Sequence, residues 1–451
     1  MFSKLINFLD HSYARNVAFT FLIGVFCIVL GSASTALFLV ASIAVIFFNP
    51  KISIKAVWQQ TLDLIIALPI LLIFPMFFIT VFITSIRGEN WLTESVFVAG
   101  SYWQFLIILP ASIGLYHLSK DINFAGIFTL GCRFGLIFVV PLSLAQIYFF
   151  NLRPEGFLSN SLIFASLCIA GAGIALTNWP EDTHKGRMLS WIVFSAGMVA
   201  ALLTFSRGML VAIAVIIAIA LLYYIKSKSK YKPNIKMIAV ISASIFAIFA
   251  TLLQTNNGWR ILNNRILKPI EMLSQGQLED HSINHRLDMQ VTGFNAFLER
   301  PLVGHGIQNS VEVANELSEE VLGRVTNYTY THLHNDYLTH AVGGGVLLFL
   351  LFVCVILSPL ILSWKLQKTE DGTSLFYYGL MLSGAYFTIA MTNIVFHNDQ
   401  LTTMFCAATI FIVVRFVQNM HDVYEVRIPD LQTIANGINP IGLTETSIKS
   451  K

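Results

Sequence analysis

The chain has 451 residues, of which 55% are hydrophobic and only 12% are charged. Soluble domains carry about 25% charged residues, so this composition excludes a soluble globular protein and indicates one that crosses a membrane several times. The net charge of +3 indicates little by itself, and we expect membrane lipids rather than nucleic acid around this protein.

Apolar runs in the chain predict an all-α polytopic membrane protein. A helix that spans a bilayer needs roughly 20 apolar residues. The runs predict twelve spans, at residues 16–32, 34–49, 61–84, 96–118, 124–149, 158–178, 188–205, 208–225, 237–255, 337–363, 374–395 and 401–418. The first run is expected to be a retained helix rather than a cleaved signal peptide. All five cysteines lie in apolar runs, so neither disulfides nor a thiolate metal site is expected.

The distribution of Lys and Arg predicts the orientation, because cytoplasmic connections are richer in them. Connections on one side hold fourteen of these residues: Lys4, Arg15, Lys51, Lys55, Lys120, Lys185, Arg187, Lys226, Lys228, Lys230, Lys232, Lys236, Lys365 and Lys368. Short connections on the other side hold three: Arg87, Arg153 and Arg207. We therefore expect cytoplasmic termini, spans one to nine in 1–255, a large extracytoplasmic loop with amphipathic helices at 256–336, spans ten to twelve in 337–418, and a cytoplasmic tail at 419–451.

The large loop carries its own helical pattern. Apolar residues recur at helical spacing at Leu287, Val291, Phe294 and Leu298, and Pro301 follows the run. This pattern predicts an amphipathic helix on the membrane surface or against the bundle. Gly304 and Gly306 indicate a turn, and the acidic stretch 312–324 indicates a solvated helix face. In the tenth span, residues 343–345 are all glycine, which indicates close helix packing or room for a lipid chain.

Five arginines are candidates for contacts to an anion, and the charge is most unusual where it lies at or within a predicted span. Arg207 lies between two spans, where it is either a snorkelling side chain or a clamp for phosphate oxygens. Arg286 opens the predicted loop helix and opposes its dipole, so it either pairs at the surface or contacts an anion. Arg260 and Arg265 are weaker cases of the same kind. Arg133, inside the fifth span, is either part of a structural ion pair or a contact to a lipid phosphate.

The segment His332-Leu333-His334-Asn335-Asp336 gathers polar groups at the mouth of the tenth span. It could be a solvated helix entry or contain a buried, hydrogen-bonded histidine. A His-x-His metal site is a further alternative, although no ligand-spaced partner motif accompanies it. The remaining interpretation makes His334 a general base, because an imidazole pKa of about 6.5 suits proton abstraction near neutral pH. Neighbouring arginines would favour the neutral, basic form.

Taken together, these motifs resemble the lipopolysaccharide O-antigen ligases, whose wider family includes O-antigen polymerases and bacterial protein O-oligosaccharyltransferases. Thr204–Gly208 resembles the family's arginine turn, and Arg286–Phe297 resembles its loop helix with an arginine. His332–Asn335 resembles the family's histidine box, in which a glycine follows the histidine by eleven positions, here Gly345. The family pattern then has Gly, Thr or Tyr three residues later, where this chain has Leu348.

The resemblance implies a GT-C-like fold and an inverting glycosyl transfer, without metal or other cofactor, at the periplasmic face of the bacterial inner membrane. The donor would be O-antigen on undecaprenyl diphosphate, and the acceptor would be a sugar hydroxyl of lipid A–core. A diphosphate leaving group needs cations aimed at it, and no carboxylate cluster suited to Mg²⁺ stands out in the loop. The alternatives are an O-antigen polymerase, a protein O-oligosaccharyltransferase and, outside enzymes, a glycolipid flippase or transporter.

Within this scheme, we expect His334 to deprotonate the acceptor hydroxyl while Arg207 and Arg286 bind the diphosphate. The further substrate-binding candidates are His332, Asn335, Arg133, Arg260 and Arg265.

Overall fold

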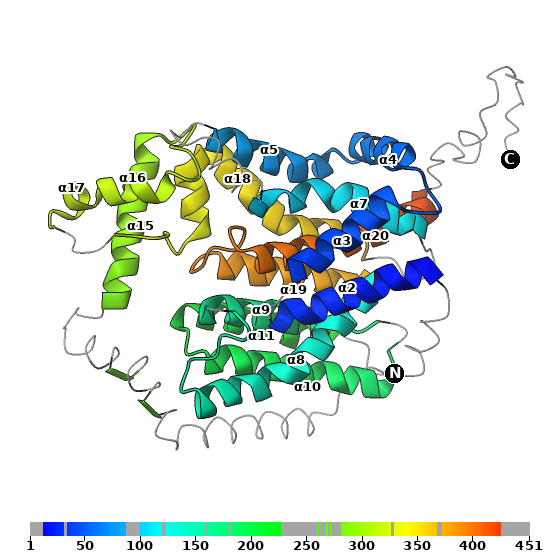
Figure 1. Cartoon of the computed structure of the whole chain (residues 1–451), viewed down its shortest axis with the longest axis horizontal. Helices are drawn as coiled ribbons and strands as arrows, with labels where there is room; N and C mark the ends of the chain where they lie inside the picture. The colour runs from blue at the N-terminus through cyan, green and yellow to red at the C-terminus, as the bar shows by residue number, and fades with distance from the viewer. Residues whose placement is uncertain are drawn as a thin grey trace, which may run out of the picture.

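The computed structural model describes residues 12–30, 34–86, 100–118, 123–158, 160–179, 182–226, 259–260, 263, 267–268, 271, 281–325, 329–367 and 372–424. The described elements are all helical. Most of them run along one common direction, and α15 (His281–Glu299) runs across one end of this bundle (Figure 1). The predicted ninth span at 237–255 lies outside the described residues, as does most of the predicted tail.

The bundle is built from the apolar runs of the sequence. Its helices are α2 (Ser12–Leu30), α3 (Ser34–Phe47), α4 (Ile54–Ala67), α5 (Ile73–Ser85), α7 (Gln104–Leu118), α8 (Phe124–Phe149), α9 (Ser161–Leu176), α10 (His184–Leu203), α11 (Leu210–Lys226), α18 (Asp336–Lys365), α19 (Gly372–Ile389) and α20 (Asp399–Tyr424). In the described part of the chain, five helices are long and apolar enough to cross a membrane, or six if the bent pair α4 and α5 is one span. The chain is thus a polytopic membrane protein, and the number of twelve spans stays a prediction.

One predicted span is broken. Residues 61–84 were expected to form a single helix, but α4 and the following helices meet at a bend of 117°. The short 3₁₀ helix η1 (Pro69–Leu72) lies at the bend. Pro69 has no N–H to donate and its ring restricts the residue before it, so Leu68 takes a non-helical conformation with φ −136° and ψ 77°. The proline in the run was the signal for this break.

The loop helix predicted from apolar spacing is confirmed as α15. Its apolar stripe of Leu287, Val291, Phe294 and Leu298 points outward, with each side chain between 46% and 54% exposed. The opposite face of α15 is buried against α18 and α16 (Ser310–Glu316). A small apolar cluster joins these elements, and it consists of Met289, Ala296, Ala314, Tyr330, Leu333 and Val342.

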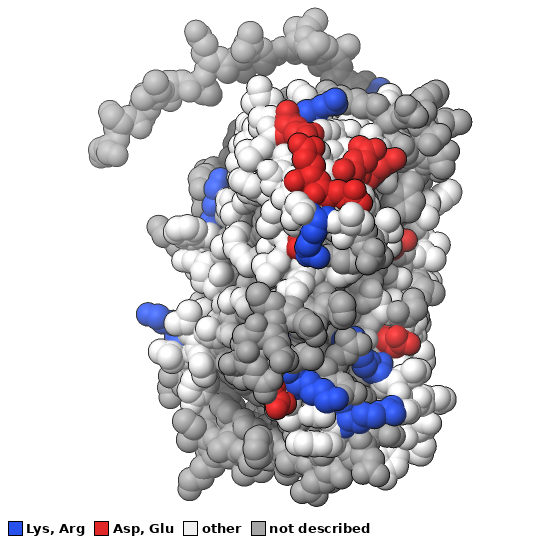
Figure 2. Space-filling model, turned by 90° about the vertical axis from the view of Figure 1, so that its left-hand side faces the viewer, with Lys and Arg blue, Asp and Glu red and all other residues white. Residues whose placement is uncertain are grey.

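The end of the bundle that carries α15 also carries an acidic patch. Figure 2 looks onto this end and shows acidic side chains gathered in one area, with most Lys and Arg elsewhere. The patch lies over α16 and α17 (Ser318–Leu322), and its exposed members are Glu312, Glu316, Glu319 and Glu320. These positions agree with the solvated acidic helix face predicted for residues 312–324.

Helix α18 is interrupted at Gly345, which has φ 68° and ψ −165°. The turn at residues 301–306 fills the break: the backbone N–H groups of His305 and Gly306 donate to Val342 and Gly343, and Val346 donates to Pro301, each at 2.8 Å. A Cβ atom on Gly345 would lie 2.4 Å from the carbonyl carbon of Leu302. The three glycines therefore admit the loop, whereas close packing of a second helix was expected.

Candidate functional site

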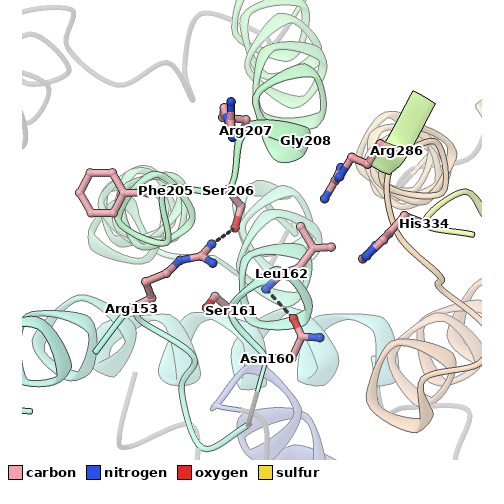
Figure 3. A pocket seen from close by; sticks show the side chains of 10 residues that line it. All are labelled: Arg153, Asn160, Ser161, Leu162, Phe205, Ser206, Arg207, Gly208, Arg286 and His334. Carbon is pink, nitrogen blue, oxygen red and sulfur yellow. Dashed lines mark hydrogen bonds between the residues drawn. The ribbon is translucent and has the colours of Figure 1, made fainter. Parts of the chain in front are cut away.

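A cavity of about 310 Å³ lies where four separate segments of the chain meet. The described residues that line it are Arg153, Asn160, Ser161, Leu162, Phe205, Ser206, Arg207, Gly208, Arg286 and His334. Arg286 and His334 approach from one side, and Arg153 and Ser206 lie opposite them (Figure 3). Three residues chosen from the sequence, Arg207, Arg286 and His334, thus line one cavity.

The arginine turn between α10 and α11 has a strained backbone. Phe205 has φ 52°, a left-handed conformation that is costly for a residue with a side chain and is often found at functional sites. Arg153 supports this turn, because its Nε and Nη2 donate to the carbonyl oxygen of Thr204 at 3.1 and 2.9 Å. Its Nη2 also donates to Oγ of Ser206 at 3.1 Å.

In the sequence, Arg153 contributes only to the Lys and Arg bias that predicts the orientation of the chain. The signal for a further role was present, because Arg153 is one of the few cations in the short connections opposite the Lys-rich side. Its partner Thr204 is 51 residues away in the chain. No local pattern around Arg153 reveals that contact.

Arg286 approaches the backbone of the arginine turn at Gly208. A Cβ atom on Gly208 would lie 3.0 Å from Nη1 of Arg286 and 3.0 Å from Cβ of Thr392. The glycine therefore allows the close approach of an arginine. Burial and the charge of Arg207 both lower the pKa of Arg286. Two guanidinium groups that repel each other in one cavity favour an anion between them.

His334 is held in place by its neighbours in the chain. Its own φ is 49°, Leu333 before it is buried, and the side chain of Asn335 after it caps α18 by accepting from the N–H of Leu338 at 3.2 Å. The ring of His332 lies against it, with centroids 3.9 Å apart. His332 and Asn335 therefore lie beside the cavity-lining histidine but are not among the lining residues.

The surroundings of His334 keep its imidazole neutral. Burial, together with the nearby His332 and the charge of Arg286, lowers the pKa of His334 to about 3. Its Nδ1 is buried and makes no hydrogen bond to any described residue. Nε2 is then the ring nitrogen that can face the cavity, and it can accept a proton if Nδ1 carries the ring hydrogen.

Arg133 is not part of this cavity. Its guanidinium is buried and donates to both carboxylate oxygens of Asp182 at 2.8 and 3.0 Å, and to the carbonyl oxygens of Ala175 and Thr177 at 2.9 and 2.7 Å. Asp182 comes just before α10, whereas Arg207 follows its other end, about 30 Å away for a helix of 20 residues. The structure thus shows the ion-pair alternative, and we drop the prediction of a substrate contact.

The two remaining arginine candidates also lie elsewhere. Arg260 is exposed and donates to Oδ1 of Asn151 at 2.9 Å, so it contacts the connection between α8 and α9 outside the cavity. Arg265 lies outside the described residues. Neither Arg260 nor Arg265 is among the described residues that line the cavity.

The charge of the cavity defines the ligand it suits. Its lining contains three arginines, and none of the described lining residues is Asp or Glu. Arginine presents a planar fork of donors that matches phosphate and carboxylate oxygens. Within the described ranges, no group of three or more His, Cys, Asp and Glu residues could hold a metal ion. The arrangement suits an anionic ligand next to a neutral imidazole.

Comparisons with known proteins bear on the segment that contains this site. Residues 191–353, which include Arg207, Arg286 and His334, match the family model described as O-antigen ligase. An uncharacterized protein of Haemophilus influenzae (strain ATCC 51907 / DSM 11121 / KW20 / Rd) is 23% identical over 209 residues. That alignment covers 46% of this chain and 51% of the relative, so the chain spans about half the length of the curated protein it matches. The segment that holds Arg207, Arg286 and His334 is thus similar to the O-antigen ligase family over residues 191–353.

Proposed function

We propose that the protein is an O-antigen ligase that transfers O-antigen polysaccharide from undecaprenyl diphosphate to a sugar hydroxyl of lipid A–core. The observation that carries the proposal is the cavity, where Arg207, Arg286 and a neutral His334 meet without a carboxylate among the described lining residues. The family match supports ligase- or polymerase-type glycosyl transfer in general. The donor, the acceptor and the mechanism are our proposal.

Arg207 and Arg286 bind the donor diphosphate in this mechanism. When the bond between the anomeric carbon and the diphosphate oxygen breaks, the bonding electrons leave with the oxygen and negative charge grows there. Cations already fixed in the cavity stabilise that charge without reorganising, and such preorganisation is often the largest single contribution to catalysis. Arg153 keeps the turn that carries Arg207 in place through Thr204 and Ser206.

His334 acts on the acceptor. Nε2 of its neutral imidazole takes the proton of the acceptor hydroxyl while the oxygen attacks the anomeric carbon from the side opposite the diphosphate. One C–O bond forms, one breaks, and the configuration at the anomeric carbon inverts. The products are the glycosylated acceptor, undecaprenyl diphosphate and a protonated His334, which releases its proton to water. The negative diphosphate next to the ring raises the histidine pKa toward the useful range while the donor is bound.

The proposal includes the placement of the protein. The cavity faces the periplasm, both termini lie in the cytoplasm of a bacterial inner membrane, and the fold is GT-C-like. Residues 256–336 form the periplasmic loop between spans 1–255 and 337–418, and residues 419–451 form a cytoplasmic tail. The Lys and Arg distribution supports this orientation. Cysteine labelling of introduced sites in intact cells and in opened spheroplasts tests it.

Reconstituted transfer tests the function. Purified protein in liposomes receives undecaprenyl diphosphate-linked O-antigen together with lipid A–core, and the glycolipid products are separated. Arg286→Gln is expected to lower transfer by about 10²- to 10³-fold, the usual loss for one oxyanion-stabilising donor. Arg300→Gln, an exposed position just beyond the same helix, is the matched control and should be unaffected.

The same assay separates the alternatives. A product that joins two lipid-linked glycans would indicate a polymerase, and movement of the glycolipid across the bilayer without any product would indicate a flippase. Near wild-type turnover in His334→Ala would remove the general base from the mechanism.

A further inference from the structure

Residues 390–397, which make up most of the connector between α19 and α20, contact both the arginine turn and the segment that follows His334. None of these residues lines the cavity. They make side-chain or backbone hydrogen bonds to the start of α18, to the arginine turn and to α9. These contacts come from positions that the sequence motifs do not include.

Asp336 joins the connector to the histidine segment. The carboxylate is fully buried, and its Oδ2 accepts from the backbone N–H groups of Val395 and Phe396 at 2.9 and 3.2 Å. Its own N–H donates to the carbonyl oxygen of Ala390 at 2.8 Å. Nδ1 of the buried His340 lies 3.2 Å from Oδ1, so a second polar group accompanies the charge. The residue two positions after His334 is therefore fixed to the connector at three points.

Thr392 joins the same connector to the arginine turn. Its Oγ1 donates to the carbonyl oxygen of Gly208 at 3.1 Å. The next residue, Asn393, is buried and donates from Nδ2 to Oγ of Ser166 in α9 at 3.3 Å. The arginine turn, which carries Arg207, is thereby bonded to the same connector that is bonded to the start of α18.

We propose that Asp336 and Thr392 are positioning residues, through which the connector 390–397 sets the spacing between His334 and the Arg207–Gly208 turn. The effect of this spacing on catalysis rests on the proposed function, whereas the hydrogen bonds are features of the structure. His334 precedes α18, Arg207 lies in the turn between α10 and α11, and the two residues are 127 positions apart in the chain. Both are held to one short segment by hydrogen bonds at fixed points, and misplacement of reacting groups is costly in rate.

The two attachments predict different kinetic effects. Thr392→Val keeps the shape of the side chain and removes the hydroxyl, which loosens the turn that binds the diphosphate. The donor KM should rise about 2- to 10-fold, the range for one lost hydrogen bond, with little change in kcat. Asp336→Asn keeps the size of the side chain but removes the charge that holds two N–H groups. It should lower kcat at least about tenfold and leave the donor KM near the wild-type value.

Two variants serve as controls. Thr392→Ser keeps the hydroxyl and should restore the wild-type donor KM. Thr388→Val removes a hydroxyl of the same type from α19, where its bonds run to Gly384 and Ala385 of the same helix. It should leave both kinetic constants unchanged. If Asp336→Asn does not accumulate as folded protein, the Thr392 variants decide the matter on their own.

Two measurements test the placement of the arginine turn and of His334 without an assay of catalysis. The affinity of the purified full chain for inorganic pyrophosphate, by calorimetry, should fall about 2- to 10-fold in Thr392→Val and stay unchanged in Thr388→Val. The rate at which diethyl pyrocarbonate modifies His334, by peptide mass spectrometry, should change in Asp336→Asn. Wild-type pyrophosphate affinity and donor KM in Thr392→Val would overturn the inference. Wild-type protein that binds pyrophosphate but transfers no glycan would refute the proposed function alone.

Discussion

A single added methyl group at Gly208 is expected to slow transfer while leaving the fold intact. In Gly208→Ala, the Cβ atom would lie 3.0 Å from Nη1 of Arg286, 3.0 Å from Cβ of Thr392 and 3.1 Å from its Oγ1. Ordinary van der Waals contact begins at 3.4 Å. Because Thr392 is anchored in the connector, most of the adjustment of about 0.4 Å falls on the arginine and on the turn.

The magnitude follows from the sensitivity of rate to position. A misplacement of about 1 Å in a catalytic arrangement can cost about 10²-fold, so about 0.4 Å corresponds to roughly sixfold on a logarithmic scale. The loss should appear in the steady-state rate of glycan transfer by the reconstituted protein, with an unchanged melting temperature. Gly100→Ala is the control, since a Cβ atom on Gly100 would meet no atom within 4 Å.

Wild-type kcat and donor KM in Gly208→Ala would refute the reasoning. They would mean that Arg286 does not lie against the turn when substrate is bound. An equal loss in Gly100→Ala would refute it as well, because the effect would then be unrelated to the cavity.

Four further predictions concern the site and its surroundings. Arg153→Gln removes three hydrogen bonds from the arginine turn and should lower the rate of transfer about tenfold or more. A wild-type rate in this variant would show that Arg153 does not support the turn. Since the pKa of His334 is about 3 in the free protein, its basic form persists on acidification, and kcat/KM for the donor should stay level between about pH 7 and pH 5. An imidazole with the ordinary pKa of about 6.5 would be mostly protonated at pH 5, and a matching fall in kcat/KM would contradict this environment. Transfer should persist in excess EDTA, and a loss that a divalent metal restores would contradict the arginine-based mechanism. Asp182→Asn leaves the Arg133 guanidinium buried without its carboxylate and should cost about 3–5 kcal/mol of stability, seen as a lower melting temperature with an unchanged donor KM.

The sequence predicted the helices well where lipid decides the structure. A long apolar run must satisfy its backbone internally, so runs such as 124–149 coincide with a helix over the same residues, here α8. The interruptions were harder to predict. Pro69 was a visible breaker inside a predicted span, and the three glycines at 343–345 indicated a close approach without saying what approaches.

The candidate site was only partly predictable for a related reason. Arg207, Arg286 and His334 stand out because polar groups at those places need a partner or a task. The supporting residues do not stand out, because Arg153 sits in a polar connection and Thr392 lies near the end of the predicted span 374–395, and both residue types are ordinary in those places. Their partners are fixed by tertiary contacts over 51 and 184 positions. Arg133 shows the converse, since a charge within a predicted span drew attention although its partner Asp182 already explains it.

The break in α18 bears on how the loop can vary in length. The carbonyl groups freed at the break accept hydrogen bonds from the N–H groups of His305 and Gly306. Residues 301–306 therefore supply the hydrogen bonds that the next turn of the helix would have made. An insertion in residues 301–306 would leave the carbonyl groups at the break without hydrogen bonds in an apolar environment and would disturb α18. Residues 323–325 are exposed and end α17 through a left-handed glycine, and within them Arg324 pairs with Asp288 of α15, so a tag or an added segment is better placed after Arg324. Residues 301–306 thus cannot change in length without disturbing α18, whereas the chain after Arg324 can.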